Sequence, residues 1–232
     1  MKKSALIVGA GSGISASFAR ALHREGYRIG LAARGVGDLA PLCSETGAEA
    51  YPCDATDPAQ VAALFERLDR DFGRIDAVLY NASQRTHGPI AQLDAEEVRK
   101  SLMVSAFGGF LVAQESARRM LAHGSGTILF TGASASVKGY AQSAPFAMGK
   151  FALRGLAQSM ARELHPKGIH VAHFVIDGMV RNAELGRAEP DTPPGDTHLD
   201  PAAIAESYMH VLAQPRSAWT WEVELRPWTE KF

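Results

Sequence analysis

The sequence predicts an α/β fold in which a parallel sheet of about seven strands carries helices on both faces. Short apolar runs rich in β-branched residues alternate with longer segments of helical period along the 232 residues. A glycine-rich turn joins the first apolar run to the first helical segment. Because crossovers between parallel strands are right-handed, successive helices are expected to stack on both faces of the sheet.

The apolar runs place the strands in chain order. We expect strands at residues 4–8, 28–33, 48–53, 77–80, 127–131, 170–176 and 222–225. The segments of helical period between them predict helices at 14–25, 58–72, 95–122, 143–164 and 201–213. Several of these begin close to a Pro or an Asp, residues that favour the first turn of a helix.

One segment, residues 183–199, fits neither period. It contains Pro190, Pro193, Pro194 and Gly195, and we expect it to form a loop or lid for the substrate rather than a linker between domains. No internal repeat or change of composition divides the chain. Residues 1–232 are therefore expected to form a single domain.

Composition excludes several classes of partner. Twenty-four Lys and Arg against 25 Asp and Glu give a net charge of −1, without the basic stripe that nucleic-acid binding requires. No window reaches the roughly 18 apolar residues of a membrane span, and the run after Met1 is too short for a signal peptide. Cys43 and Cys53 could be free thiols or a bridge, and the lack of a secretory leader favours reduced thiols in a cytoplasmic protein.

The glycine-rich turn predicts a phosphate site. It lies directly between the first strand and the first helix and consists of Gly9, Ala10, Gly11, Ser12, Gly13 and Ile14. Such a turn lets the backbone approach a pyrophosphate, and the helix beyond it offers unpaired N–H groups and the positive end of its dipole. An ordinary tight turn is the alternative. The placement favours a Rossmann-type fold that binds a nicotinamide dinucleotide.

The end of the second strand selects the form of the cofactor. Dinucleotide-binding folds contact the adenosine ribose here, and an Asp or Glu would bind a free 2′-hydroxyl. Here Ala33 leaves space and Arg34 offers a planar cation that can bind a 2′-phosphate. NADP(H) is therefore favoured over NAD(H), with a solvated surface arginine as the alternative.

Ordered motifs along almost the whole chain resemble those of the short-chain dehydrogenase/reductase family. The motifs are Gly9–Ile14, Cys53-Asp54, Asn81-Ala82-Ser83, the helix that begins Phe146-Ala147-Met148-Gly149-Lys150, and Asp177-Gly178-Met179-Val180. The resemblance implies a sheet order of 3-2-1-4-5-6-7 and an oxidoreductase. It also implies cofactor contacts at Asp54, Asn81, Ala82 and Val180. Val8, Ser15 and Asp177 depart from the residues usual in the family.

The catalytic set of the family is incomplete here. Phe146 stands where the family has its Tyr, and a benzyl ring can neither donate nor accept a proton. General acid–base catalysis contributes about 10² to 10⁴-fold, so the loss is expected to be severe without abolishing hydride transfer. Ungapped spacing puts Ala133 on the usual Ser position, and a shift of one residue would restore Ser134. Ser105 stands in place of the helical Asn, while Lys150 is retained for the nicotinamide ribose.

Other groups could supply the proton in place of the tyrosine. Tyr140 and Ser143 precede the catalytic helix, His87 follows the fourth strand, and Asp177 falls beside the expected nicotinamide pocket. A carboxyl group held against an apolar pocket can stay protonated and act as an acid, although an Asp-Gly turn is the simpler explanation for Asp177. The histidines show no metal-ligand spacing, so no metal is expected.

These inferences favour an atypical NADP(H)-dependent oxidoreductase that acts on an unidentified small carbonyl or alcohol substrate, with Lys150, Ser134 and Asp177 as candidate catalytic residues. The alternative is a catalytically silent NADP(H)-binding protein with a regulatory or scaffolding role. The helix from Phe146 to Leu164 is too apolar all round for a solvent-facing helix. Since family members often pair through it, a homo-oligomer, either a dimer or a tetramer, is expected.

Overall fold

A single parallel sheet runs through the computed structural model, which describes residues 2–191 and 193–231. Within these residues its seven strands follow the order β3-β2-β1-β4-β5-β6-β7, as the sequence predicts. The strands are β1 Ser4–Val8, β2 Arg28–Ala33, β3 Glu49–Pro52, β4 Ala77–Tyr80, β5 Gly126–Thr131, β6 Ile169–Ile176 and β7 Glu222–Leu225. Each lies within a residue or two of its expected position. The sheet is therefore the Rossmann-type arrangement expected from the alternating pattern.

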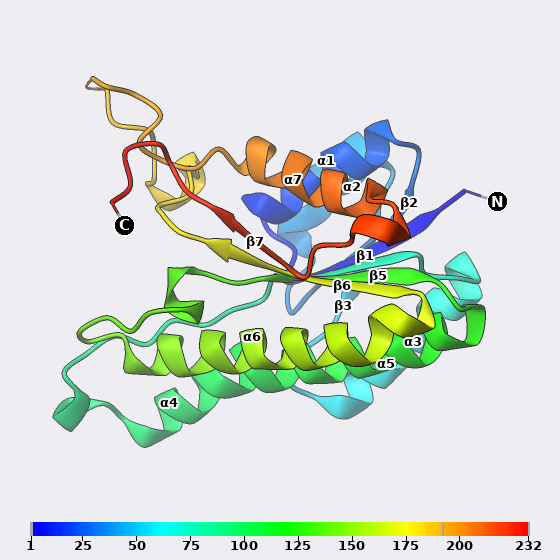
Figure 1. Ribbon diagram of the computed structural model, residues 1–232, viewed down its shortest axis with the longest axis horizontal. Helices are drawn as coiled ribbons and strands as arrows, with labels where there is room; N and C mark the ends of the chain where they lie inside the picture. Colours follow the sequence, from blue (N-terminus) through cyan, green and yellow to red (C-terminus); the bar gives the residue numbers. More distant parts are fainter. Residues whose placement is uncertain (1, 192, 232) are drawn as a thin grey trace.

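Helices cover both faces of the sheet (Figure 1). On one face lie α1 Ile14–Arg24, α2 Ala40–Thr46 and α7 Pro201–Ala213, and on the other lie α3 Pro58–Phe72, α4 Ala95–Leu102, α5 Gly108–His123 and α6 Ala144–Leu164. Each layer closes its own cluster of buried apolar side chains. Strands β1, β4 and β6 are buried along their whole length, because helices exclude water from both sides of a parallel sheet.

The fold differs from the expected elements in two places. Helix α2 was not expected, since its seven residues are too few to show a helical period. The helix expected at 95–122 is interrupted by a π-helical turn at Met103–Phe107. Here the hydroxyl of Tyr80 donates a hydrogen bond to the Val104 carbonyl, and a Cβ on Gly108 would lie 2.5 Å from that hydroxyl oxygen. The π-helical turn thus leaves room for the Tyr80 side chain.

Tyr208 on α7 connects helix α1 to the ends of strands β5 and β6 at the cleft. Its ring meets Phe18 of α1 edge-on at 5.3 Å and Phe174 of β6 at 4.3 Å. Its hydroxyl lies 3.0 Å from Oγ1 of Thr131, the last residue of β5. Aromatic pairs of this geometry add to the burial of their surface. The end of β5 is thereby fixed by a side chain of α7.

His173 on β6 fixes the turn that follows β5. Its Nδ1 lies 3.1 Å from a carboxylate oxygen of Glu222, and its Nε2 lies 3.3 Å from Ser136 Oγ, which accepts a hydrogen bond from the Ala133 N–H at 3.1 Å. Burial lowers the pKa of His173 to about 4 despite the opposing effect of Glu222. The imidazole is therefore neutral near pH 7, donating from Nδ1 and accepting at Nε2.

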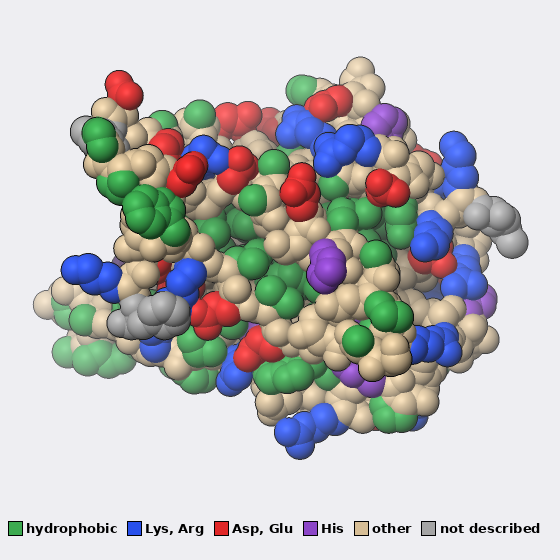
Figure 2. Space-filling view, turned by 45° about the horizontal axis from the view of Figure 1, so that its top comes forward, with side chains coloured by type: hydrophobic (Ala, Val, Ile, Leu, Met, Phe, Trp, Pro, Cys, Tyr) green, Lys and Arg blue, Asp and Glu red, His purple; other side chains and the backbone are tan. Residues whose placement is uncertain are grey.

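Charged side chains of both signs are interspersed over the face shown in Figure 2. In the part of the chain that the structure describes, none of the helices combines the length and apolar character that crossing a membrane requires. Cys43 and Cys53 are both free thiols. They do not form the disulfide bond that the sequence left open as an alternative.

Candidate active site

A long cleft opens at the carboxyl ends of the central strands, where open α/β sheets bind ligands. It consists of two adjoining hollows of about 670 Å³ and 620 Å³, and Asn81 and Ser83 line both. Arg34 and Asp54 line the smaller hollow, whereas Phe146 and Lys150 line the larger one. The shape suits a ligand with two halves joined at the middle.

The turn after β1 is fixed by close packing and by hydrogen bonds. Gly9 has φ of +82°, and a Cβ placed on it would lie 2.4 Å from the backbone nitrogen of Ala82, so a side chain is excluded. The Asn81 amide donates to Ser15 Oγ at 2.8 Å, and Ser15 Oγ donates to the Gly9 carbonyl at 3.0 Å. Ser15, unusual for the family, thus ties the start of α1 to the turn.

The same turn presents free donors to the cleft. Within the described residues, no hydrogen bond engages the backbone N–H groups of Ser12, Gly13 and Ile14. A Cβ on Gly11 would meet nothing within 4 Å, so the space above the turn is open. Unpaired N–H groups at the positive end of a helix are suited to a pyrophosphate. The residues present therefore fit the central part of a dinucleotide.

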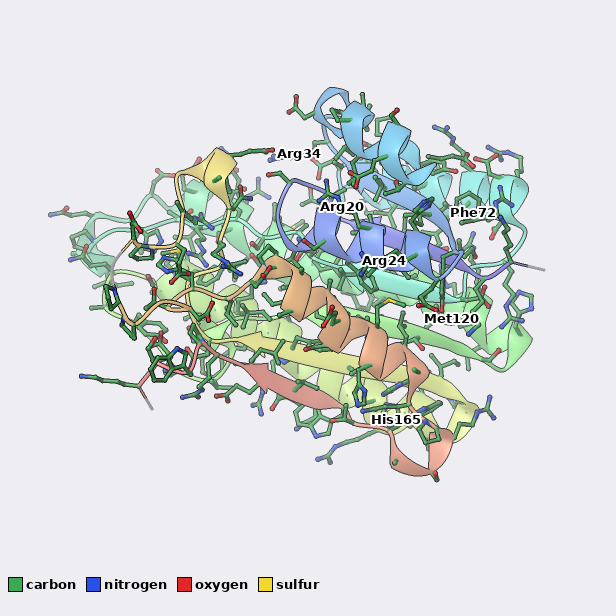
Figure 3. All side chains as sticks on the ribbon, turned by 90° about the horizontal axis from the view of Figure 1, so that it is seen from above. Arg20, Arg24, Arg34, Phe72, Met120 and His165 are labelled. Carbon is green, nitrogen blue, oxygen red and sulfur yellow. The ribbon has the colours of Figure 1, made fainter. Side chains whose placement is uncertain are left out.

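Arg34 and Asp54 lie together around the smaller hollow. Arg34 follows β2, is exposed, and forms no ion pair with any residue that the structure describes; in Figure 3 its label stands between residues 183–185 and α2. One carboxylate oxygen of Asp54 accepts hydrogen bonds from the Thr56 N–H at 2.9 Å and its hydroxyl at 2.8 Å. Ala82 lines the same hollow. The cation at Arg34 is thus available to a ligand.

Lys150 on α6 holds its ammonium group inside the protein. The side chain is 2% exposed, and Nζ donates a hydrogen bond to the carbonyl oxygen of Thr131 at 2.7 Å. Burial, with a smaller contribution from the positive charge of Arg85, lowers the pKa of Lys150 to about 7. Removing a cation from water disfavours its charged form. Near neutral pH the amine can therefore both hold and release a proton.

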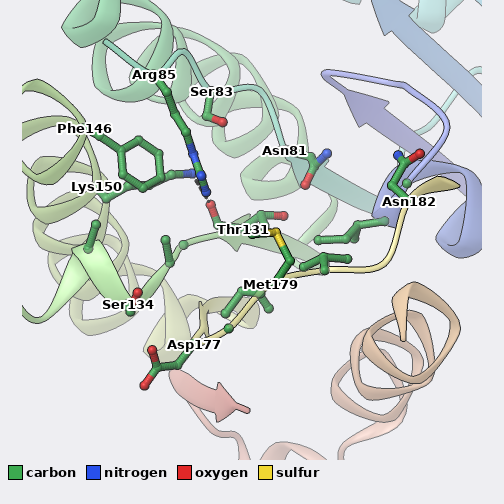
Figure 4. Close-up of a pocket in the computed structure, with 18 of the residues that line it drawn as sticks. Asn81, Ser83, Arg85, Thr131, Ser134, Phe146, Lys150, Asp177, Met179 and Asn182 are labelled. Carbon is green, nitrogen blue, oxygen red and sulfur yellow. Dashed lines mark hydrogen bonds between the residues drawn. The ribbon is translucent and has the colours of Figure 1, made fainter. Parts of the chain in front are cut away.

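Two basic side chains lie close to the ring of Phe146. The guanidinium carbon of Arg85 lies 4.4 Å from the centre of the Phe146 ring, and Lys150 Nζ lies 5.8 Å from it. Figure 4 shows Arg85 reaching down from the loop after β4 toward Phe146 and Lys150. Cations are attracted to the face of an aromatic ring. The Phe146 ring, which has no hydroxyl group, thus supports a guanidinium group.

The structure places the remaining candidate residues around the same hollow. Ala133 packs against Phe146 with Ala135 and Ala147, and Ser134 lines the cleft beside it. Val180 also lines the cleft and pairs with Leu199. Ser105 is buried in the π-helical turn, where a Cβ on Gly149 would lie 2.7 Å from it.

Asp177 lies in charged rather than apolar surroundings. Its carboxylate is buried and lies 3.4 Å from Lys138 Nζ and 3.2 Å from the guanidinium of Arg226.

His87 and Ser143 also line the hollow, and the distance between His87 Nδ1 and Ser143 Oγ is 3.0 Å. Among the described residues, no group of three or more His, Cys, Asp and Glu is placed to hold a metal ion.

The sequence did not point to four residues of the cleft. Thr131 contributes only its carbonyl oxygen to Lys150, and Asn182 donates to Ser12 Oγ at 3.2 Å. Arg85 and Arg187 come from loops that follow β4 and β6. A signal existed for Arg85, since it lies four residues after Asn81 and follows a strand end that faces the site. Arg187 lies in the segment 183–199 that the sequence predicts as the substrate lid, although nothing singled out this residue within it.

Comparison with known proteins gives consistent matches over most of the chain. The family model described as short chain dehydrogenase matches residues 3–192. D-threitol dehydrogenase of Mycolicibacterium smegmatis is 33% identical over 199 residues, which cover 84% of this chain and 76% of that protein. A short-chain dehydrogenase structure from Rhodopseudomonas palustris is 37% identical with a TM-score of 0.84, covering 97% of this chain and 99% of that one.

A further match is an archaeal enzyme with a bound nucleotide. It is the alcohol dehydrogenase of Thermococcus sibiricus, solved in complex with 5-hydroxy-NADP. It is 25% identical to this chain, with a TM-score of 0.86, and covers 100% of this chain and 99% of that one.

We expect Arg85→Gln to raise the pKa of Lys150 above about 7, because the substitution removes a like charge that disfavours the ammonium. The titration of the Lys150 Cε resonance by NMR measures the midpoint directly. Arg162→Gln is the matched control, since Arg162 is an exposed residue of α6, the helix that carries Lys150. An unchanged midpoint in Arg85→Gln would contradict the electrostatic contact.

Proposed function

This chain belongs to the short-chain dehydrogenase family, and from that premise we propose that it is an NADP(H)-dependent oxidoreductase acting on a small carbonyl or alcohol substrate. The observation that carries the proposal is the open cleft, in which a phosphate-binding turn and a buried Lys150 lie at opposite sides of one hollow. Family membership establishes the oxidoreductase class. The cofactor preference, the catalytic residues and the substrate are our assignments.

We assign the cofactor contacts along the cleft as follows. Arg34 binds the 2′-phosphate, with Asp54, Asn81 and Ala82 around the adenosine half. The free N–H groups of Gly11, Ser12, Gly13 and Ile14 bind the pyrophosphate, and Gly9, whose N–H is bonded to Ala32, lets the turn lie close to it. Lys150 and Val180 contact the nicotinamide half. Support for NADP(H) comes from Arg34 and Ala33, because a guanidinium group binds phosphate in two-point geometry.

We assign the proton donor to Lys150. A nicotinamide dinucleotide supplies the hydride when it is bound. Catalytic acids work best when their pKa lies near the working pH, and burial brings Lys150 Nζ to about 7. Arg85, supported by the Phe146 ring, stabilises negative charge that develops on the substrate oxygen. Ser134 remains a candidate for orienting that oxygen, whereas Asp177 is engaged by two cations and we assign it a positioning role.

Residues 183–199 are our candidate for the substrate lid. Leu185 and Arg187 from this segment line the cleft. Glu189 organises the segment by accepting hydrogen bonds from the Thr197 N–H at 2.6 Å and the His198 N–H at 3.1 Å. We also place the protein in the cytoplasm, because its free thiols suit a reducing compartment.

Replacement of the catalytic Tyr by Phe146 favours a second candidate function, that of a silent NADP(H)-binding protein with a regulatory or scaffolding role. In that case the cleft would bind the dinucleotide without turning over a substrate. The position of Lys150 and Arg85 beside Phe146 favours the enzyme, since a scaffold has no need to bury an ammonium group.

We expect NADPH to bind at least about tenfold more tightly than NADH, and Arg34→Ala to remove this preference by weakening NADPH alone. Fluorescence titration of the purified protein measures both affinities. Arg24→Ala is the control, because Arg24 is an exposed arginine at the far end of α1. Equal affinity for the two nucleotides would contradict the assignment of NADP(H), and no binding of either would contradict the function.

Phe146→Tyr separates the enzyme from the scaffold. If Lys150 and Arg85 already provide the chemistry, the substitution leaves NADPH oxidation unchanged or lowers it, because the proton donor is in place before the phenol is added. The measurement is NADPH oxidation with a panel of aldehydes, ketones and quinones. Activity that is absent from the natural protein and arises only in Phe146→Tyr would support the silent scaffold.

We expect the protein to form a dimer or a tetramer. Apolar side chains that are 38–50% exposed lie in and around α5 and α6, namely Phe107, Phe110, Met148 and Phe151, and a second copy of the chain is the occupant that we assign to them. Sedimentation equilibrium gives the state, and Phe151→Glu is expected to shift it toward the monomer. If the unsubstituted protein is still monomeric at about 50 μM, this assignment is overturned.

A further inference from the structure

Two arginine side chains line the larger hollow without an acidic partner. Arg85 comes from the loop after β4 and Arg187 from the segment after β6, and neither forms an ion pair with a residue that the structure describes. Burial and the positive charge of Arg187 lower the pKa of Arg85, so the two guanidinium groups repel each other across the hollow. An arrangement of this kind becomes favourable when an anion lies between them.

The acidic groups of the hollow do not neutralise this charge. Asp177 is already paired with Lys138 and Arg226. Glu230, the other carboxylate that lines the hollow, is exposed and forms no ion pair within the described residues. Lys150 adds a third basic group beside Arg85. The part of the cleft around Phe146 therefore has an excess of positive charge.

The Phe146 ring supports Arg85 within the hollow. The guanidinium carbon lies 4.4 Å from the ring centre, within the range of a cation–π contact. Such a contact limits the positions that the guanidinium group adopts, so less entropy is lost when it binds a carboxylate. The N–H groups of Arg85 have no acidic partner among the described residues and are left for a ligand.

We propose that Arg85 and Arg187 form a carboxylate subsite, and that the substrate is a small oxo acid or hydroxy acid whose carboxylate they hold. The proposal rests on the proposed function, because the subsite adjoins Lys150 and the expected nicotinamide position. It names the substrate class and assigns Phe146 a role as the support for Arg85. Met179, Leu185 and Tyr140 line the remainder of the hollow and suit a short hydrocarbon part.

A phosphate group of the cofactor is the other source of an anion for these arginines. The turn at Ser12, Gly13 and Ile14 already offers free N–H groups to a pyrophosphate, whereas Arg85 lies against Phe146 and next to Lys150. The observations therefore favour a carboxylate on the substrate side. Titrating NADP⁺ alone and 3-oxobutanoate alone into the protein separates the two sources.

The test compares 3-oxobutanoate with its neutral isostere 3-oxobutanamide by isothermal titration calorimetry. Each is titrated into the cofactor-free protein and into protein saturated with NADP⁺, where ketone and nucleotide are both oxidised and no turnover occurs. We expect the carboxylate to bind at least about tenfold more tightly than the amide. Arg85→Gln and Arg187→Gln are each expected to remove that preference, Arg85→Lys to restore part of it, and Arg162→Gln to leave it unchanged.

The outcomes separate this proposal from the proposed function. Equal affinity for the acid and the amide, or a preference that survives both glutamine variants, overturns the carboxylate subsite. Glutamine variants that weaken NADP⁺ binding while leaving 3-oxobutanoate binding intact overturn it in favour of a cofactor phosphate. A carboxylate preference in protein that fails to bind NADP⁺ supports the subsite while contradicting the proposed function.

Discussion

The hydrogen bond from the buried ammonium of Lys150 to the carbonyl oxygen of Thr131 is the interaction on which the architecture of the site depends. A lysine removed from water without a carboxylate partner is costly to the fold, and a single carbonyl oxygen offsets only part of that cost. Burial brings the pKa of the amine to about 7. Between this value and the ordinary lysine pKa, the folded state binds fewer protons than the unfolded state, so stability rises with pH over that range.

The elements around Lys150 are arranged to hold this charge in place. Tyr208 of α7 supports Thr131 through a hydroxyl contact at 3.0 Å. The ring of Phe146 lies close to both Lys150 and Arg85. The Phe146 ring carries no ionisable group and gives the guanidinium group of Arg85 a surface to lie against. Family membership and the oxidoreductase class rest on matches over most of the chain rather than on this one side chain.

The sequence predicted the parts of the fold that depend on local pattern. Strand β1 and the turn at Gly9–Ile14 follow from an apolar run and its glycines, and the strand order follows from family resemblance. The π-helical turn at Met103–Phe107 could not be predicted, because it results from the contact between Tyr80 and Val104 across the fold. The same reason applies to Asp177, whose partners Lys138 and Arg226 come from distant segments. Arg85 and Arg187 meet only after folding, so no spacing along the chain connects them.

The crystal structure of the complex with NADP⁺ tests the central claim most directly. We expect the dinucleotide to span both hollows, with its 2′-phosphate on Arg34, its pyrophosphate on the N–H groups of Ser12, Gly13 and Ile14, and its nicotinamide ribose on Lys150 Nζ. The hydrogen bond between Lys150 and Thr131 is expected to lengthen or to be shared with the ribose. A nucleotide bound outside the cleft, or one that leaves Lys150 without contact, would contradict the claim that the cleft is a cofactor site that includes Lys150.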